Sequence, residues 1–245
     1  MNDPITVGDL VSRVRRAGAH GLLIELSDPT WVTALDAQVR QQWGGSKSRG
    51  VWVRDIVPAA RTLLLDGIDV GDDPGRELSA PGAFDPGALE AGAMRSLIDE
   101  LTSWTLTPLR SRDARSVEVP VVFDGPDLKA VAEMWDMTVA EAVATVVGCD
   151  FQVAFCGFAP GFAYMSGLPP ERSVPRRSIP RTRVPAGAFG LAGEYAGIYP
   201  RSSPGGWQLL GTAVEVLLWD EGRQDPALLT PGTRVRVHEH PGAER

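Results

Sequence analysis

The chain has 245 residues, of which 24 are basic and 31 acidic, so its formal net charge at pH 7 is -7. This acidic balance excludes a general attraction to nucleic acid or to anionic lipid, and 43% hydrophobic residues are enough to build packed cores. No uncharged apolar run approaches the roughly 20 residues that a membrane-spanning helix needs, and the first residues lack a signal-peptide pattern. We therefore expect a folded cytoplasmic protein with no nucleic-acid or membrane partner.

The first part of the sequence, residues 1–112, predicts a small mixed α/β sandwich domain. Short apolar or extended stretches predict strands at 22–26, 51–57 and 61–67. A helix is expected to begin at Asp28 and Pro29, because an aspartate caps free amides and proline suits the first helical turn. Its apolar residues recur at helical spacing and predict a buried face: Trp31, Leu35, Val39 and Trp43. A second helix is expected over 83–101.

Residues 113–245 predict a second domain that is mostly β. Asp127 is expected to cap a short helix, and Thr138 and Glu141 have the spacing of a capping box before a second helix. From Asp150 onward short β-like runs alternate with glycine and proline turns, which is typical of an all-β sandwich or barrel. These runs are 151–155, 188–192, 206–210, 213–219 and 233–239.

Cysteines and histidines give no sign of a metal or thiol site. Cys149 and Cys156 are the two cysteines, and we interpret both as small buried hydrophobes rather than as a disulfide or a catalytic thiol. The HEH run at 238–240 is interpreted as a C-terminal tail, and metal-ligand spacing is absent elsewhere. No histidine lies within the glycine and proline block described next, so we expect neither a metal nor a Ser-His-Asp triad there.

A block rich in glycine and proline runs from Cys156 to Gly211 and contains most of the candidate site. Between Glu171 and Gly211 there are six arginines and two acidic residues, so this window carries +4 while the rest of the chain carries -11. Guanidinium groups bind a carboxylate or phosphate through paired hydrogen bonds, so a small anionic substrate is predicted. The arginines assigned to catalysis are Arg176, Arg177 and Arg181. For any single arginine, a solvent-facing position or a structural ion pair remains the alternative.

Aromatic residues in the same block fall in or beside glycine turns, which suits the lining of a concave site. The alternative for each ring is core packing. The residues assigned to substrate binding are Phe158, Pro160, Gly161, Phe162, Tyr164, Pro185, Gly187, Tyr195, Tyr199, Ser203, Gly205, Gly206 and Trp207. The run SPGGW at 203–207 is interpreted as a tight turn whose backbone amides face a ligand, and with the GFAPGF loop it is assigned to stabilising negative charge on oxygen.

Three motifs in this order and spacing, GFAPGFAYMSGL, PRRSIPRTRVPAG and AGIYPRSSPGGW followed by LLG, resemble one family. That family contains subunit 1 of bacterial allophanate hydrolase, the B subunit of ATP-dependent 5-oxoprolinase, and an inhibitor of a sporulation histidine kinase. The resemblance implies an α+β fold in which a small N-terminal domain precedes a cyclophilin-like β-barrel. It also implies a partner, a larger barrel subunit similar to allophanate hydrolase subunit 2, and possibly a third, lactam-binding subunit.

The function implied by the resemblance is that of one subunit of a heteromeric amide hydrolase, inactive alone, that converts 5-oxo-L-proline to L-glutamate using ATP held through the complex. Two alternatives stay open: a carboxyltransferase subunit of the allophanate hydrolase or urea carboxylase type, which would need biotin carried elsewhere, and a non-enzymatic inhibitor of a histidine kinase. The sequence departs from the residues usual in the family at Gly148, Ala188, Tyr195, Ala196 and Thr212.

Overall fold

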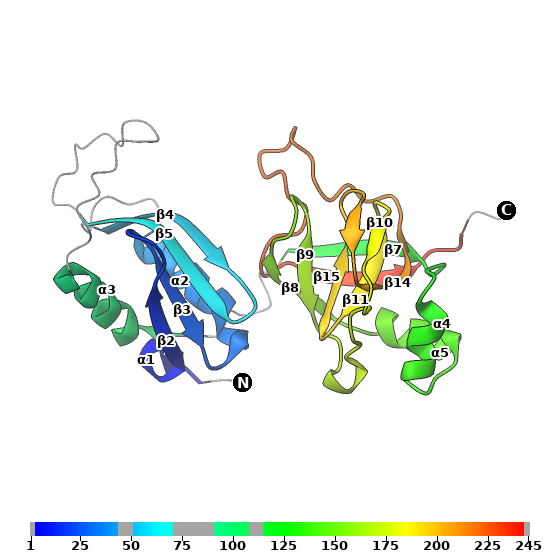
Figure 1. Cartoon of the computed structure of the whole chain (residues 1–245), viewed down its shortest axis with the longest axis horizontal. Helices are drawn as coiled ribbons and strands as arrows, with labels where there is room; N and C mark the ends of the chain where they lie inside the picture. The colour runs from blue at the N-terminus through cyan, green and yellow to red at the C-terminus, as the bar shows by residue number, and fades with distance from the viewer. Residues whose placement is uncertain (1–2, 44–50, 71–90, 108–114, 243–245) are drawn as a thin grey trace. The chain divides into compact units, whose positions relative to one another are not determined.

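The computed structural model describes residues 3–43, 51–70, 91–107 and 115–242. The chain divides into two compact units, Met1–Arg110 and Ser111–Arg245 (Figure 1). The domain boundary predicted between 112 and 113 lies outside the described residues. Within the described ranges, no helix is long and apolar enough to cross a bilayer.

The N-terminal unit is built on a four-stranded antiparallel sheet with the strand order β2-β3-β5-β4. Its strands are β2 (Val11–Arg16), β3 (Leu22–Leu26), β4 (Val51–Pro58) and β5 (Thr62–Val70). The three strands predicted from apolar stretches are confirmed as β3, β4 and β5, whereas the edge strand β2, rich in arginine, was not predicted. A two-stranded ladder joins β1 (Ile5–Thr6) to β6 (Thr105–Leu106).

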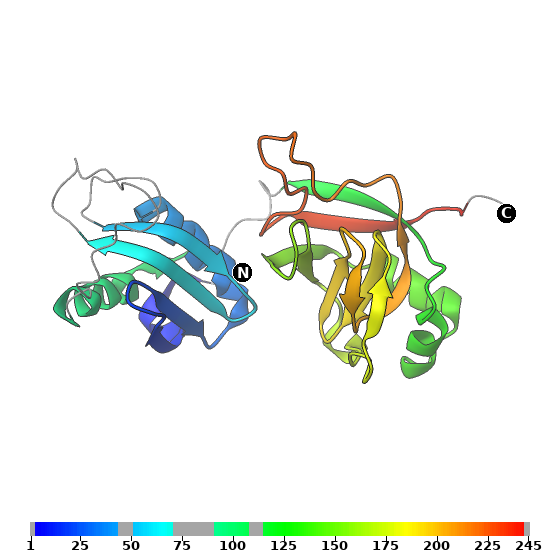
Figure 2. The same ribbon diagram turned by 45° about the horizontal axis from the view of Figure 1, so that its top comes forward.

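Helices cover one face of this sheet (Figures 1 and 2). They are α1 (Val7–Leu10), the 3-10 turn η1 (Pro29–Trp31), α2 (Val32–Trp43) and α3 (Ala91–Ser103). The predicted start is confirmed, because Asp28 Oδ1 accepts a hydrogen bond of 2.9 Å from the amide of Thr30. The predicted apolar face is also confirmed, since Leu35 and Val39 are fully buried in one core with the sheet.

The C-terminal unit is a closed barrel with the strand order β11-β12-β9-β8-β15-β7-β14. Its strands are β7 (Ser116–Val122), β8 (Phe151–Cys156), β9 (Ala163–Ser166), β11 (Ala188–Ala192), β12 (Tyr195–Ile198), β14 (Gln208–Ala213) and β15 (Arg234–Glu239). A separate antiparallel ribbon joins β10 (Arg181–Val184) to β13 (Ser203–Gly205). The predicted fold class, an α+β protein whose small mixed domain precedes a β-barrel, is confirmed.

Two short helices, α4 (Leu128–Met134) and α5 (Val139–Val147), follow β7 and pack against the barrel (Figure 1). The capping box of α5 is confirmed by reciprocal hydrogen bonds between Thr138 and Glu141. The predicted role of Asp127 is wrong: it occupies the N-cap position of α4, but its side chain makes no capping hydrogen bond. Its carboxylate is engaged elsewhere, as described below.

Two other expectations for the barrel are corrected. The strand predicted over 213–219 does not form, because β14 ends at Ala213 and Glu215 adopts a φ of 55°, which an extended strand cannot contain. The strand predicted over 233–239 is confirmed as β15, and it includes His238 and Glu239, which were also interpreted as part of a tail and which pair in parallel with β7. This parallel pairing lets the last strand close the barrel.

Candidate functional site

Six of the predicted binding residues form one aromatic cluster on the barrel, namely Phe158, Phe162, Tyr164, Tyr195, Tyr199 and Trp207. Phe162 is its centre, with ring centroids 5.0 Å from Tyr164, 5.3 Å from Tyr199 and 5.4 Å from Trp207. Phe162, Tyr199 and Trp207 are buried, so these three rings pack as a small core of their own. Phe158 is 60% exposed and Tyr164 and Tyr195 are half-buried, so these three are open to a ligand.

The GFAPGF loop, residues 157–162, holds itself in a compact shape. The amide of Ala159 donates to the carbonyl of Gly157 at 2.8 Å, and the amide of Phe162 donates to the carbonyl of Ala159 at 2.9 Å. Phe158 takes a φ of 68°, an uncommon conformation for a residue with a side chain, which aims its ring outward. The exposed ring of Phe158 is therefore presented by a preordered loop.

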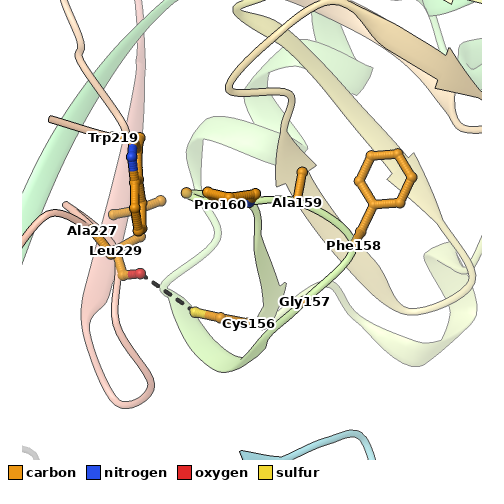
Figure 3. A pocket seen from close by; sticks show the side chains of 9 residues that line it. Cys156, Gly157, Phe158, Ala159, Pro160, Trp219, Ala227 and Leu229 are labelled. Atoms are coloured by element: carbon orange, nitrogen blue, oxygen red, sulfur yellow. Dashed lines mark hydrogen bonds between the residues drawn. The ribbon is translucent and has the colours of Figure 1, made fainter. Parts of the chain in front are cut away.

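A cavity of about 450 Å³ lies on the side of this loop opposite to the ring of Phe158 (Figure 3). In Figure 3, Pro160 extends toward Trp219 across the cavity, whereas Phe158 points away from it. The cavity is lined by Cys156, Gly157, Phe158, Ala159, Pro160, Gly161, Trp219, Ala227 and Leu229. Its lining contains no charged side chain, so it does not suit the anionic substrate predicted from the arginines.

The arginine strip is the segment 175–187. Its arginines have different hydrogen-bond partners. The carboxylate of Asp127, which is 5% exposed, accepts hydrogen bonds from Arg181 Nη2 at 2.7 and 2.8 Å and from Arg177 Nη1 at 3.1 Å. It also accepts one from the amide of Leu209 at 2.7 Å. Two of the three predicted catalytic arginines thus already share a buried counter-ion.

Arg176 is the exception in the strip. Among the described residues it has no hydrogen-bond or ion-pair partner, and its side chain is exposed. Its positive charge lowers the pKa values of the Tyr164 and Tyr199 hydroxyls, although burial of each ring, the larger effect, raises them. The guanidinium of Arg176 is therefore exposed and unpaired among the described residues, and its charge acts on two tyrosines of the aromatic cluster.

The tyrosine hydroxyls of the cluster stay protonated at neutral pH. Burial raises the pKa of Tyr195 to about 12, and the charge of Glu194 and a hydrogen bond to it add to the shift. Burial also raises the pKa values of Tyr164 and Tyr199 above their ordinary value. Each hydroxyl therefore keeps its proton at neutral pH, and that of Tyr164, which is half-buried, can donate a hydrogen bond to an anionic oxygen.

The predicted SPGGW turn is partly a strand, since Ser203–Gly205 forms β13. Glycine is required at 205, because a Cβ there would collide with the hydroxyl of Tyr199. At 206 a Cβ would meet nothing nearer than Pro180, at 3.7 Å. The ribbon of β10 and β13 therefore packs directly over the aromatic cluster.

The remaining predicted residues lie at the edge of this region. Pro185 is exposed, and Gly187 takes a φ of 81° beside the carbonyl of Ala213. Ser203 Oγ is buried without a hydrogen-bond partner in the described part of the chain. These three residues carry no contact that assigns them a role.

Cysteines and metal ligands add no chemistry to the site. Both cysteines are free, and Cys156 Sγ donates to the carbonyl of Leu229 at 3.4 Å, while burial raises its pKa to about 11 (Figure 3). Cys149 is buried near the end of α5. Across the described ranges no group of three or more His, Cys, Asp or Glu side chains could hold a metal ion.

Sequence reasoning missed Asp127, which gathers Arg177 and Arg181, and Phe155, which stacks on Tyr164 at 4.3 Å. The charge count covered only residues 171–211 and so excluded Asp127. Phe155 belongs to a predicted strand, where its ring was treated as ordinary core. Nothing in the sequence distinguishes Asp127 from the other acidic residues, because its burial and its contacts with the strip are set by the tertiary structure.

The five departures from the family pattern fall at different places. Gly148 is the C-cap of α5, and Ala188 and Ala196 are buried in β11 and β12. Thr212 Oγ1 donates to Asp124 Oδ1 at 3.1 Å. Tyr195 joins the aromatic cluster, where its ring lies 6.0 Å from Tyr164.

Curated relatives with similar sequences carry one name, that of the B subunit of 5-oxoprolinase. The chain is 40% identical over 136 residues to this protein from Escherichia coli O157:H7, covering 54% of this chain and 62% of that protein. It is 38% identical over 136 residues to the Haemophilus influenzae protein, covering 54% of this chain and 63% of that protein. It is 38% identical over 125 residues to the Bacillus subtilis protein, covering 50% of this chain and 52% of that protein. The chain thus spans less than two thirds of the length of each relative.

Solved structures share this fold. The crystal structure of TTHA0988 matches with a TM-score of 0.66 and 32% identity, covering 94% of this chain and 41% of that one. The urea amidolyase of Kluyveromyces lactis matches in fold alone, with a TM-score of 0.64 and 17% identity over 93% of this chain and 15% of that one.

The family model for the carboxyltransferase domain, subdomain C and D, matches residues 12–229, which span both units of the chain. The match includes every strand of the closed barrel except β15, and every residue of the aromatic cluster described above. The chain belongs to the family of carboxyltransferase domains, subdomain C and D.

Proposed function

We propose that the chain is one subunit of 5-oxoprolinase, an enzyme that opens 5-oxo-L-proline to L-glutamate at the expense of ATP. The observation that carries this proposal is the identity of 38–40% to three proteins that are named as the B subunit of 5-oxoprolinase. In this proposal the chain is inactive alone and works in the cytoplasm. Its partners are a second, larger barrel subunit and a lactam-binding subunit.

The geometry of the site supports a substrate of this kind. 5-Oxo-L-proline is a small flat ring with one carboxylate, and the exposed guanidinium of Arg176 has no partner among the described residues and acts through its charge on two tyrosines of the aromatic cluster. A guanidinium binds a carboxylate through two parallel hydrogen bonds, and the face of the ring can pack against Phe158, which is 60% exposed. Arg176 is therefore the residue that we assign to the substrate carboxylate.

Neighbouring groups then have supporting roles. The Tyr164 hydroxyl, which keeps its proton, can donate to an oxygen of the substrate. In the GFAPGF loop the amides of Phe158 and Gly161 have no acceptor among the described residues, so they can stabilise negative charge that develops on oxygen. Arg177 has one bond to Asp127 and a side chain that is 37% exposed, so its other donors remain open to an anion.

The arginine set does not fit a triphosphate. Arg177 and Arg181 already share the carboxylate of Asp127, and Arg183 donates to Ser202 Oγ, so Arg176 is the arginine of the strip that has no partner among the described residues. We therefore assign ATP to a partner subunit and derive no step through it. Biotin belongs only to the carboxyltransferase alternative.

No specific observation favours the other two functions. The likeness to Kluyveromyces lactis urea amidolyase, at 17% identity, concerns the fold and does not support carboxyl transfer. A kinase inhibitor would leave kinase autophosphorylation reduced when the chain is present in excess, which a direct assay would show.

The test is to co-express the chain with the proteins encoded beside its own gene and to measure glutamate released from 5-oxo-L-proline. We expect release that needs ATP and every subunit. Arg176→Ala should raise KM for the lactam by about tenfold to 100-fold, because a hydrogen-bonded contact between charged groups is lost.

The matched control is Arg236→Ala. Arg236 lies on β15 and pairs with the exposed Asp150, so KM should stay within about twofold of the wild-type value. The proposal is rejected if the complete wild-type complex releases no glutamate with ATP present. An unchanged KM in Arg176→Ala would reject the role of Arg176 alone.

A further inference from the structure

Asp127 is a buried acid that contacts three separate parts of the barrel domain. It stands 50 residues before Arg177, 54 before Arg181 and 82 before Leu209, and it accepts hydrogen bonds from all three. With an exposure of 5%, it has almost no contact with water. Its carboxylate thus joins the start of α4 to the arginine strip and to β14.

The same arginines hold the backbone that leads into β14. Arg181 Nη1 donates to the carbonyl of Trp207 at 3.3 Å, and the amide of Arg177 donates to the carbonyl of Gly206 at 2.8 Å. Gln208 Nε2 donates in turn to the carbonyl of Pro175 at 3.0 Å. The segment 206–209 is therefore hydrogen-bonded to the strip on both sides of Trp207, at Gly206 and at Gln208.

Trp207 connects this fastening to the candidate site. Its indole lies 5.4 Å from the ring of Phe162 and 5.5 Å from that of Tyr164, measured between centroids. A change in the backbone at 207 would move the indole and with it Tyr164, which faces the ligand. Asp127 is thus linked to the aromatic cluster by two consecutive contacts. Arg181 bonds Asp127, and it also bonds the carbonyl of Trp207.

We propose that Asp127 is a positioning residue of the substrate site, which orients Arg181 and the segment 206–209 so that Trp207 is held in the aromatic cluster. Asp127 touches no reacting atom. The proposal rests on the proposed function, because the site it positions is the one assigned to 5-oxo-L-proline.

Asp127 makes more hydrogen bonds to Arg181 than to Arg177, and this difference supports the proposed role. Arg181 bonds to both oxygens of Asp127 and its side chain is 20% exposed, so it is held in place. Arg177 bonds to one oxygen and is 37% exposed, so four of its five N–H donors are not used by Asp127. One carboxylate thereby fixes one arginine and leaves the other partly available to an anion.

The test compares Asp127→Asn with Asp124→Asn in the reconstituted complex. Asparagine keeps the shape and an oxygen for the amide of Leu209 but removes the charge that holds Arg181. Asp124 is the matched control, because it is an exposed acid three positions earlier that contacts Thr212 and no arginine. We expect Asp127→Asn to raise KM for 5-oxo-L-proline about tenfold and Asp124→Asn to leave it within about twofold.

KM separates positioning from simple stabilisation. A purely structural role would reduce the amount of folded enzyme, and hence the apparent kcat, without moving KM. A second readout needs no activity: in nitrogen-15 NMR of the full chain, rotation of the Arg181 guanidinium should be slow in the wild type and in Asp124→Asn but fast in Asp127→Asn. If Asp127→Asn does not fold, Arg181→Lys should raise KM in the same way, because lysine lacks the second nitrogen with which Arg181 bonds the carbonyl of Trp207 while Nη2 bonds Asp127.

The proposal is overturned if Asp127→Asn keeps both the slow guanidinium and the wild-type KM, or if Arg181→Lys leaves KM unchanged. A wild-type complex that does not act on 5-oxo-L-proline would reject the proposed function instead. In that case the NMR comparison still decides whether Asp127 positions Arg181.

Discussion

Arg172 and Trp135 each bind the backbone carbonyl of the other. Arg172 Nη1 donates to the carbonyl of Trp135 at 2.9 Å, and Trp135 Nε1 donates to the carbonyl of Arg172 at 3.0 Å. Trp135 is the C-cap of α4, and Arg172 ends the 3-10 turn η4 (Pro170–Arg172) just before the arginine strip. The pair therefore anchors one end of the strip to the helix that follows Asp127.

Loss of this reciprocal pair should cost stability. Trp135→Phe removes the indole donor and leaves the carbonyl of Arg172 without its partner, so we expect the free energy of unfolding to fall by about 1–3 kcal/mol. Urea denaturation measures the change. Met134→Ala is the control, because Met134 is 51% exposed, and its effect should stay within about 0.5 kcal/mol. Equal effects of the two substitutions would contradict the assignment.

Two adjacent glycines should respond differently to the same substitution. A Cβ at 205 would collide with the hydroxyl of Tyr199, whereas at 206 the nearest atoms belong to Pro180, at 3.7 Å. We expect Gly205→Ala to lower the free energy of unfolding by about 1–3 kcal/mol, as overpacking does, and Gly206→Ala to change it far less. Thermal unfolding of both variants provides the comparison, and the reverse order would show that β13 does not lie over Tyr199.

Alkaline pH should weaken the fold through the tyrosines. All three tyrosines of the chain lie in the aromatic cluster, and burial raises their pKa values, that of Tyr195 to about 12. Because the folded chain holds these protons more tightly than the unfolded chain, their contribution is full below the ordinary pKa of about 10 and is lost as pH rises toward 12. Denaturation by urea at a series of pH values should show this fall in stability, and Tyr195→Phe should make it smaller. A profile identical to the wild type would count against the shift in Tyr195.

The same tyrosines report on Arg176. Since its charge lowers the pKa values of Tyr164 and Tyr199, Arg176→Ala should move the spectrophotometric titration of tyrosinate to higher pH. Arg236→Ala should leave that titration where it is. An unshifted curve in Arg176→Ala would place its guanidinium away from the cluster.

Cys156 should react slowly although it lines the cavity behind the GFAPGF loop. Burial raises its pKa from 9.0 to about 11, so about 100-fold less thiolate is present at neutral pH. Alkylation by iodoacetamide should be slower than in the chain unfolded by urea by about this factor, with Cys149→Ser used so that one thiol is followed. A folded rate within about tenfold of the unfolded rate would contradict the shift.

Predictions that depended on short stretches of sequence succeeded. The capping box of Thr138 and Glu141, the strand β3 and the buried stripe containing Leu35 and Val39 each arise from residues within one turn or one strand. Such signals act locally, so they survive in any tertiary context that buries the apolar face. The strand predicted over 213–219 failed for the converse reason, since its apolar pattern says nothing of the left-handed φ at Glu215.

The candidate site divides in the same way. The glycines, prolines and aromatic residues of the loops could be recognised from the sequence, because each acts through its own backbone conformation or the size of its own side chain. The sequence by itself thus determined the family and the order of the glycine- and proline-rich loops. Only the tertiary structure decided which arginines share a buried counter-ion. That choice depends on a carboxylate 50 residues away from Arg177, whose burial makes its hydrogen bonds to the nearest guanidiniums strong, and no local pattern encodes that distance.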